Sequence, residues 1–115
     1  MGYEKISVLE GFRSDIKQLP DNCKRMAIQI LVDVKDGVLS GEPLGTSLAT
    51  GDLSDCFKVY FDPDPDFVGR GDWRFRLVYR VLSDGAVEGV VVEGVSVGRR
   101  QNLDAYLRAI ENLRR

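Results

Sequence analysis

The apolar and polar positions in the first third of the chain predict one strand followed by two helices. Residues 3–9 alternate between apolar and polar side chains, as expected of a half-buried strand. Pro20 ends the first helix, whose apolar positions recur at helical spacing: Phe12, Ile16 and Leu19. We expect the second helix to be capped by Asp21 or Asn22 and to end at Gly37. Its apolar stripe comprises Ala27, Ile30, Leu31 and Val34, and Met26 lies beside this stripe.

The remainder of the chain predicts three strands and a last helix. Residues 41–51 are rich in Gly, Pro, Ser and Thr, and residues 62–72 hold two prolines and four acids, so both are expected to be connections. Strands are expected at residues 57–61, 73–82 and 87–97, with a hairpin turn at residues 83–85. The last helix is expected to begin at Gln101 or Asn102, with the apolar stripe Leu103, Leu107, Ile110 and Leu113.

These elements predict an α+β fold with the order β-α-α-β-β-β-α. We expect a small antiparallel-rich sheet with a helical hairpin on one face and a C-terminal helix, the helices together covering a single face. Because side chains alternate across a strand, residues 73–82 separate into two sets. The core-facing set is Trp73, Phe75, Leu77, Tyr79 and Val81. The open-face set is Arg74, Arg76, Val78, Arg80 and Leu82, joined by Lys58 and Tyr60 of the neighbouring strand.

Length and composition predict one globular domain, residues 1–115. The chain is 43% hydrophobic and 30% charged, which excludes a disordered or low-complexity protein. No apolar run is long enough for a membrane span, and the N-terminus lacks the apolar core of a signal peptide. The two cysteines, Cys23 and Cys56, are too few for a disulfide framework. We therefore expect a cytoplasmic protein without a membrane partner.

Two absences restrict the chemistry. The sequence has no histidine, and its cysteines are far apart, with no CxxC pair. This excludes a zinc site and a Ser-His or Cys-His nucleophile pair, so no metal or other cofactor is expected. Any catalysis must rely on Lys, Arg, Tyr, Asp or Glu.

Charge is distributed unevenly along the chain. Residues 1–69 carry 7 basic and 12 acidic side chains, a net charge of −5, and residues 70–115 carry 9 basic and 6 acidic ones, a net charge of +3. Three arginines on one strand face repel each other, which favours a polyanionic partner or local acids. A basic face with interleaved aromatic residues is typical of nucleic-acid binding, and an ordinary solvated surface is the alternative.

Three segments resemble the motifs of a known family. Residues 55–60 (DCFKVY) are similar to the pattern G-x-[YF]-K-[VI]-K/R, and residues 75–81 (FRLVYRV) to Y-R-[LI]-[VI]-Y-x-[VI]. Residues 97–106 (VGRRQNLDAY) are similar to V-G-[KH]-R-x-x-x-x-[VA]-Y. On these segments the chain resembles the RelE branch of the RelE/ParE toxin superfamily. The resemblance implies a RelE-like microbial RNase fold.

The resemblance also implies an activity and partners. RelE-type toxins are ribosome-dependent endonucleases of toxin–antitoxin modules, and they cleave mRNA in the ribosomal A site. The ribose 2′-OH attacks the adjacent phosphorus without a metal, which leaves a 2′,3′-cyclic phosphate and a 5′-OH. The implied partners are a cognate antitoxin, the ribosome and mRNA.

The family roles are carried over by position. Arg76 matches the arginine that stabilises the scissile phosphate, and Arg100 the one that stabilises charge and protonates the leaving group. Lys58 matches a lysine that acts near the 2′-OH, for which its pKa must be lowered by neighbouring cations or burial. Tyr106 matches a tyrosine that orients or stacks on the base. Further RNA-binding candidates are Tyr60, Arg74, Arg80 and Arg99.

Other interpretations of the same residues remain open. Arg76 is alternatively a salt-bridge partner of an acid from residues 62–72, and Tyr106 a core aromatic residue of the last helix. The second family lysine corresponds to Tyr60, and the sequence pI is about 5.1. These departures leave two alternative functions. One is a ParE-like toxin that inhibits gyrase, and the other is a catalytically weakened RelE homologue that acts through protein binding.

Overall fold

The computed structural model describes residues 3–83 and 90–115 of the chain. The elements are β1 (Lys5–Val8), α1 (Glu10–Lys17), α2 (Asp21–Lys35), β2 (Glu42–Pro43), β3 (Thr46–Ser47), β4 (Gly51–Asp52), β5 (Cys56–Phe61), α3 (Pro65–Arg70), β6 (Phe75–Ser83), β7 (Val90–Arg99), a 3₁₀ turn (Gln101–Leu103) and α4 (Asp104–Leu113). No helix in this described part is both long and apolar enough to span a bilayer. The expected turn at residues 83–85 falls largely outside the described residues.

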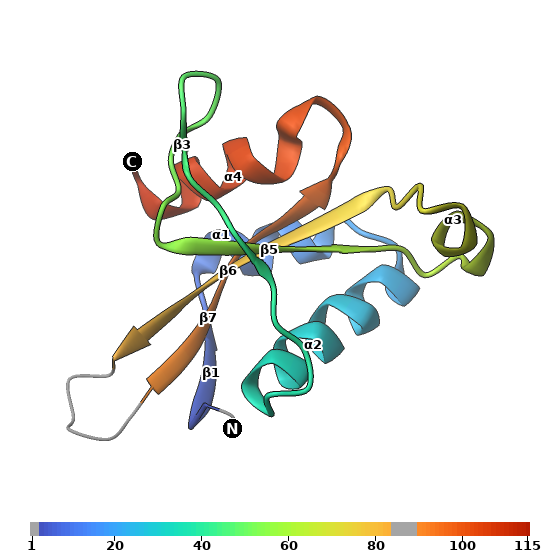
Figure 1. Ribbon diagram of the computed structural model, residues 1–115, viewed down its shortest axis with the longest axis horizontal. Coiled ribbons are helices and arrows are strands. Elements are labelled where there is room, and N and C mark those ends of the chain that lie inside the picture. Colours follow the sequence, from blue (N-terminus) through green and yellow to red (C-terminus); the bar gives the residue numbers. More distant parts are fainter. Residues whose placement is uncertain (1–2, 84–89) are drawn as a thin grey trace.

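A five-stranded sheet forms the centre of the molecule, in the order β1-β7-β6-β5-β2 (Figure 1). β1 pairs with β7 in parallel, and the other pairs are antiparallel. The predicted α+β class is confirmed, as are the tandem helices and the antiparallel meander. Two expected connections contain further structure: residues 41–51 include the short strands β2, β3 and β4, and residues 62–72 include α3. Asp64 caps α3 because its side chain accepts a hydrogen bond from the Asp66 N–H at 2.9 Å.

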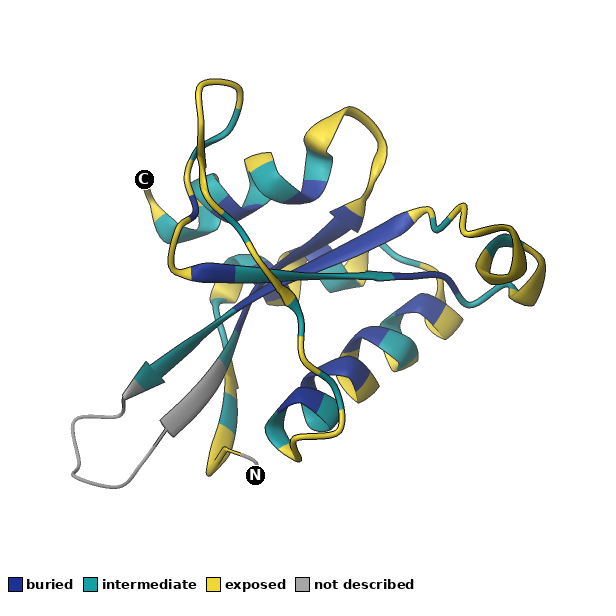
Figure 2. Cartoon of the chain, viewed as in Figure 1, coloured by how far each residue is buried: buried dark blue, intermediate teal, exposed yellow. Residues whose placement is uncertain are grey.

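The larger core lies between one sheet face and the helices α1 and α2. The predicted stripe of α2 is buried, and Gly37 adopts a positive φ of 77° just after the helix, as expected of a C-terminal glycine. This core comprises Phe12, Cys23, Ala27, Ile30, Leu31, Val34, Phe61, Phe75, Leu77, Tyr79 and Val97. Figure 2 shows the buried positions running along the inner side of α2 and the middle of the sheet.

The opposite sheet face carries a second, smaller core. It comprises Leu53, Cys56, Val78, Val95 and Ala109, with Tyr106, Ile110 and Leu113 packed against it. The expectation that all helices share one face is therefore wrong for the last helix, because α4 packs on the face opposite α2. α4 packs on this face because Val78, an apolar residue between Arg76 and Arg80 on the same face of β6, is stabilised by burial.

A network of charged side chains anchors α4 to the edge of β7. β1 pairs with β7 only as far as Gly94, so the following backbone groups need other partners. Val97 N–H donates to Asp15 at 3.4 Å, and Asn112 donates to Asp15 and to the Val95 carbonyl at 2.9 and 2.8 Å. These bonds replace the missing strand.

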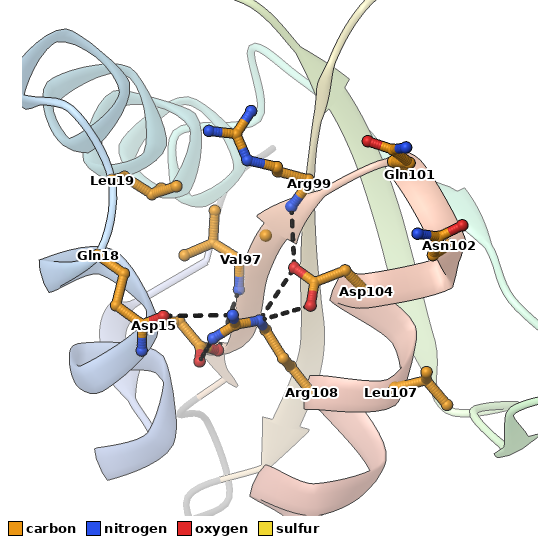
Figure 3. A pocket seen from close by; sticks show the side chains of 11 residues that line it. Asp15, Gln18, Leu19, Val97, Arg99, Gln101, Asn102, Asp104, Leu107 and Arg108 are labelled. Carbon is orange, nitrogen blue, oxygen red and sulfur yellow. Dashed lines mark hydrogen bonds and ion pairs between the residues drawn. The ribbon is translucent and has the colours of Figure 1, made fainter.

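Arg108 connects this network to the start of α4. Its guanidinium donates to Asp15 at 2.9 Å and to Asp104 at 3.0 Å, and Asp104 also accepts the Arg99 N–H at 3.1 Å (Figure 3). Burial raises the pKa of Asp15, although hydrogen bonds from Arg108 and Asn112 oppose the rise. A polar cavity of about 440 Å³ lies beside this network, between α1 and α4.

Gly98 allows α4 to approach the sheet, and its substitution tests this close contact. A Cβ at Gly98 would lie 2.4 Å from Asp104 Oδ2 and 3.2 Å from Arg108 Cδ. We expect Gly98→Ala to lower the free energy of unfolding by about 1–3 kcal/mol, measured by urea denaturation, because the Asp104 side chain must move and its hydrogen bonds to Arg99 and Arg108 are disturbed. The matched control is Gly69→Ala in α3, where nothing lies within 4 Å of the added Cβ. Equal stabilities of the two variants would contradict this account of α4 docking.

Candidate active site

Tyr60 is the centre of a cluster of cations on the α4 side of the sheet. It lies on β5 directly opposite Arg76 of β6. Lys58 Nζ donates to the Tyr60 hydroxyl at 3.0 Å, and Arg76 Nη2 donates to it at 3.4 Å. Alternation along β5 places Lys58 and Tyr60 on one face, and the strand pairing brings Arg76 to them.

The segment after β7 supplies the other two members of the cluster. The guanidinium carbon of Arg100 lies 4.5 Å from the Tyr60 ring centroid, and that of Arg76 lies 3.8 Å from the Tyr106 ring centroid. The four residues predicted to be catalytic, Lys58, Arg76, Arg100 and Tyr106, are thus brought together around Tyr60. We call these five residues the Tyr60 cluster.

Arg76 is buried, and no acidic side chain in the described part of the chain pairs with it. It is 5% exposed and lies between the rings of Tyr60 and Tyr106. Within residues 3–83 and 90–115, no acceptor lies within hydrogen-bond distance of its Nε and Nη1. Burial of an unpaired charge is costly, and the two aromatic faces only partly offset this cost. The free N–H groups are suited to bidentate binding of an anion such as a phosphate.

The cluster lowers the pKa of Tyr60 to about 8. Burial alone would raise this pKa, but the hydrogen bond from Lys58 and the charge of Arg76 outweigh burial because both favour the phenolate. The same hydrogen bond to Tyr60 raises the pKa of Lys58. The condition for Lys58 to act as a base, a lowered pKa, is therefore not met here. The cluster instead favours the ionised form of Tyr60, whose pKa it lowers.

Three expected RNA-binding arginines lie outside the Tyr60 cluster. Arg74 precedes β6 and forms two hydrogen bonds to Asp62, at 2.8 and 2.9 Å. Arg80 lies four residues beyond Arg76, about 13 Å along the strand, and binds Glu93 at 2.7 Å. Arg99 contacts the Phe75 ring, on the sheet face opposite Arg76.

Two features of the site were missed by the sequence interpretation. Trp73 was expected to face the core, but it is half-buried and packs edge-on against Tyr60, with ring centroids 6.5 Å apart. Tyr60 was expected to contact RNA and, at the position of the second family lysine, to share the role of base, but its direct contacts with Lys58 and Arg76 were not predicted. The signal for the second feature was present: an aromatic hydroxyl on the same strand face as a lysine, with an arginine on the facing strand.

Solved structures show the fold of the chain. A mutant of E. coli toxin RelE in the free state, with two arginines replaced by alanine, is similar with a TM-score of 0.64 and 22% identity, over 98% of this chain and 99% of that one. This chain has a RelE-type toxin fold. The toxin–antitoxin complex RelBE2 from Mycobacterium tuberculosis is similar with a TM-score of 0.57 and 17% identity, over 87% of this chain and 100% of that one. No family model matches the sequence, and no curated protein matches it. Within this RelE-type fold, the Tyr60 cluster lies where β5, β6 and the start of α4 meet.

The lowered pKa of Tyr60 is testable by ultraviolet titration of the four tyrosines of the chain. We expect one tyrosine to ionise with a midpoint near pH 8, and Tyr60→Phe to remove that step. Because the folded state favours the phenolate, Tyr60 contributes stability above pH 10, its ordinary pKa, and this contribution is lost as the pH falls through about 8. A step near pH 8 that persists in Tyr60→Phe would assign it to another tyrosine.

Proposed function

We propose that this chain is the toxin of a toxin–antitoxin module and an endoribonuclease that cleaves mRNA at the ribosome. The observation that carries the proposal is Arg76, a buried guanidinium whose Nε and Nη1 have no hydrogen-bond partner among the described residues. It shares Tyr60 as a neighbour with Lys58 and Arg100. Such a group of donors is suited to the charge that accumulates on phosphate oxygens during cleavage. The RelE-type fold supports the same proposal, and the solved RelBE2 complex supports an antitoxin partner.

Each member of the Tyr60 cluster receives a step of the reaction. The Tyr60 phenolate accepts the proton of the ribose 2′-OH, whose oxygen then attacks the phosphorus. Arg76 and Arg100 stabilise the negative charge on the phosphate. The bond to the 5′ oxygen breaks beside Arg100, and this oxygen takes a proton from water, which leaves a 2′,3′-cyclic phosphate and a 5′-OH. The hydroxide formed from that water takes the proton back from Tyr60, so the phenolate is restored. Lys58 stays protonated and maintains the lowered pKa of Tyr60.

Tyr106 has to move before a phosphate reaches Arg76. Its ring lies 3.8 Å from the Arg76 guanidinium and is part of the cover that leaves Arg76 only 5% exposed. Once displaced, the ring is available to stack on a base next to the cleaved bond, since any base has a face for such stacking. When the substrate binds, a phosphate therefore replaces the Tyr106 ring as the neighbour of the Arg76 guanidinium.

Substitution of the two arginines tests the proposed cleavage. We expect Arg100→Ala and Arg76→Gln each to reduce the cleavage of ribosome-bound mRNA about 100-fold, because each removes a donor to the phosphate. The matched control is Arg13→Ala, an exposed arginine on α1. The readout is mapping of transcript 5′ ends after induction, with purified protein checked for folding.

The same measurement distinguishes the alternatives. Cuts locked to codon positions and lost with Arg100→Ala support the proposal. Growth arrest that is equal in all three variants, with no new 5′ ends, would overturn it. Inhibition of DNA supercoiling by purified gyrase would then support the ParE-like alternative, and antitoxin binding without any cleavage would support the weakened homologue.

The pH dependence of cleavage tests the role of Tyr60. We expect the rate to rise as the pH increases toward about 8, because the phenolate is the form that accepts the proton, and to level off above that pH. Tyr60→Phe should abolish this rise. A wild-type rate that is flat between pH 6 and 9, about two units below and one above the Tyr60 value, would exclude Tyr60 as the base.

A further inference from the structure

A mostly apolar cavity opens beside the Tyr60 cluster, between α2 and β5. Its volume is about 290 Å³. Lys58 and Tyr60 line the cavity and also belong to the cluster, so the two sites share the edge of β5. Its lining also includes Met26, Ile30, Ser40, Glu42 and Trp73.

The open edge of β5 supplies polar groups to this cavity. Leu44 N–H donates to the Cys56 carbonyl at 2.9 Å, so every second residue of β5 directs its backbone groups toward the β2 side. β2 pairs with β5 only at Phe57 and Lys58. By the same alternation, the N–H and C=O of Tyr60 face the cavity beyond the end of β2.

The chemistry of the cavity is that of a site for one nucleobase. Its walls combine the side chain of Trp73 with the aliphatic side chains of Met26 and Ile30, and bases stack on such surfaces. A backbone donor and acceptor side by side match the edge of a base, which presents both kinds of group. The volume is just below the range of about 300–1,000 Å³ that is typical of sites for larger ligands.

Charge complementarity favours a nucleotide over a peptide as the occupant. Lys58 and Glu42 both line the cavity, and Arg76 and Arg100 contact Tyr60, which the cavity and the cluster share. A phosphate bound at these cations carries a base on its adjoining ribose, on the side of Tyr60 that leads to the cavity. A peptide strand would find only residues 59–61 of β5 left open beyond β2, which is too short for a stable ladder.

We propose that this cavity binds a single nucleobase of the RNA, next to the phosphate held by the Tyr60 cluster. The proposal rests on the proposed function and adds a base subsite to it. Trp73 is the single tryptophan of the chain and lines the cavity, so its fluorescence reports on occupancy directly.

The test is titration of the intact protein with the four ribonucleoside 5′-monophosphates, with Trp73 fluorescence corrected for nucleotide absorbance. We expect saturable quenching by at least one nucleotide and none by ribose 5-phosphate, which has the phosphate but no base. Ser40 is exposed at the cavity rim, so Ser40→Tyr should fill the cavity and weaken nucleotide binding about tenfold. Ser14→Tyr, an exposed position on α1, is the matched control and should bind as the wild type does.

The outcomes separate this inference from the proposed function. Quenching that Ser40→Tyr does not weaken, or no saturable quenching by any nucleotide, overturns the base subsite even if the wild-type protein cleaves RNA. Saturable quenching by N-acetyl-leucinamide alone would assign the cavity to a protein side chain, and it also overturns the inference. Nucleotide binding that Ser40→Tyr weakens supports the subsite, and if RNA is then not cleaved, only the proposed nuclease function fails.

Discussion

The position of α4 depends on one arginine held between two aspartates. Arg108 binds Asp15 of α1 and Asp104 at the start of its own helix, and both acids also accept backbone N–H groups from the edge of β7. The network therefore satisfies a strand edge that β1 leaves open, and it fixes the helix to that edge at the same time. Because α4 is fixed there, Tyr106 lies over Arg76 and closes the Tyr60 cluster.

The Tyr60 cluster concentrates cations that no acid among residues 3–83 and 90–115 neutralises. Aromatic faces and one hydroxyl take the place of carboxylates around Arg76, since Tyr60 and Tyr106 contact its guanidinium. Positive charge next to a phenol favours the phenolate, which is why the pKa of Tyr60 lies well below its ordinary value. This arrangement is suited to binding an anion. A bound phosphate would neutralise the cations, which have no carboxylate partner in the described part of the chain.

The acidic composition of the chain does not describe the charge at this site. The acids that contact arginines do so elsewhere: Asp62 binds Arg74, Asp55 binds Arg115, and Glu93 binds Arg80. In the described part of the chain, Lys58, Arg76 and Arg100 are left without such ion pairs. A net charge of −2 is therefore compatible with a locally positive hollow, because the potential near a site depends on the nearest unpaired charges.

The sequence by itself determined the features that depend on local periodicity. The stripe of α2, the glycine after it and the shared face of Lys58 and Tyr60 all follow from repeats of 3.6 or 2 residues, which the chain carries without help from distant segments. The motif resemblance also indicated which residues would meet. Tertiary structure decided the side on which α4 packs and the pairing of Tyr60 with Arg76. It also decided that Arg74 forms an ion pair with Asp62 and does not join the Tyr60 cluster. These features depend on strand register and helix docking, which are set by contacts between residues far apart in the chain. The local periodicity of the sequence therefore does not predict them.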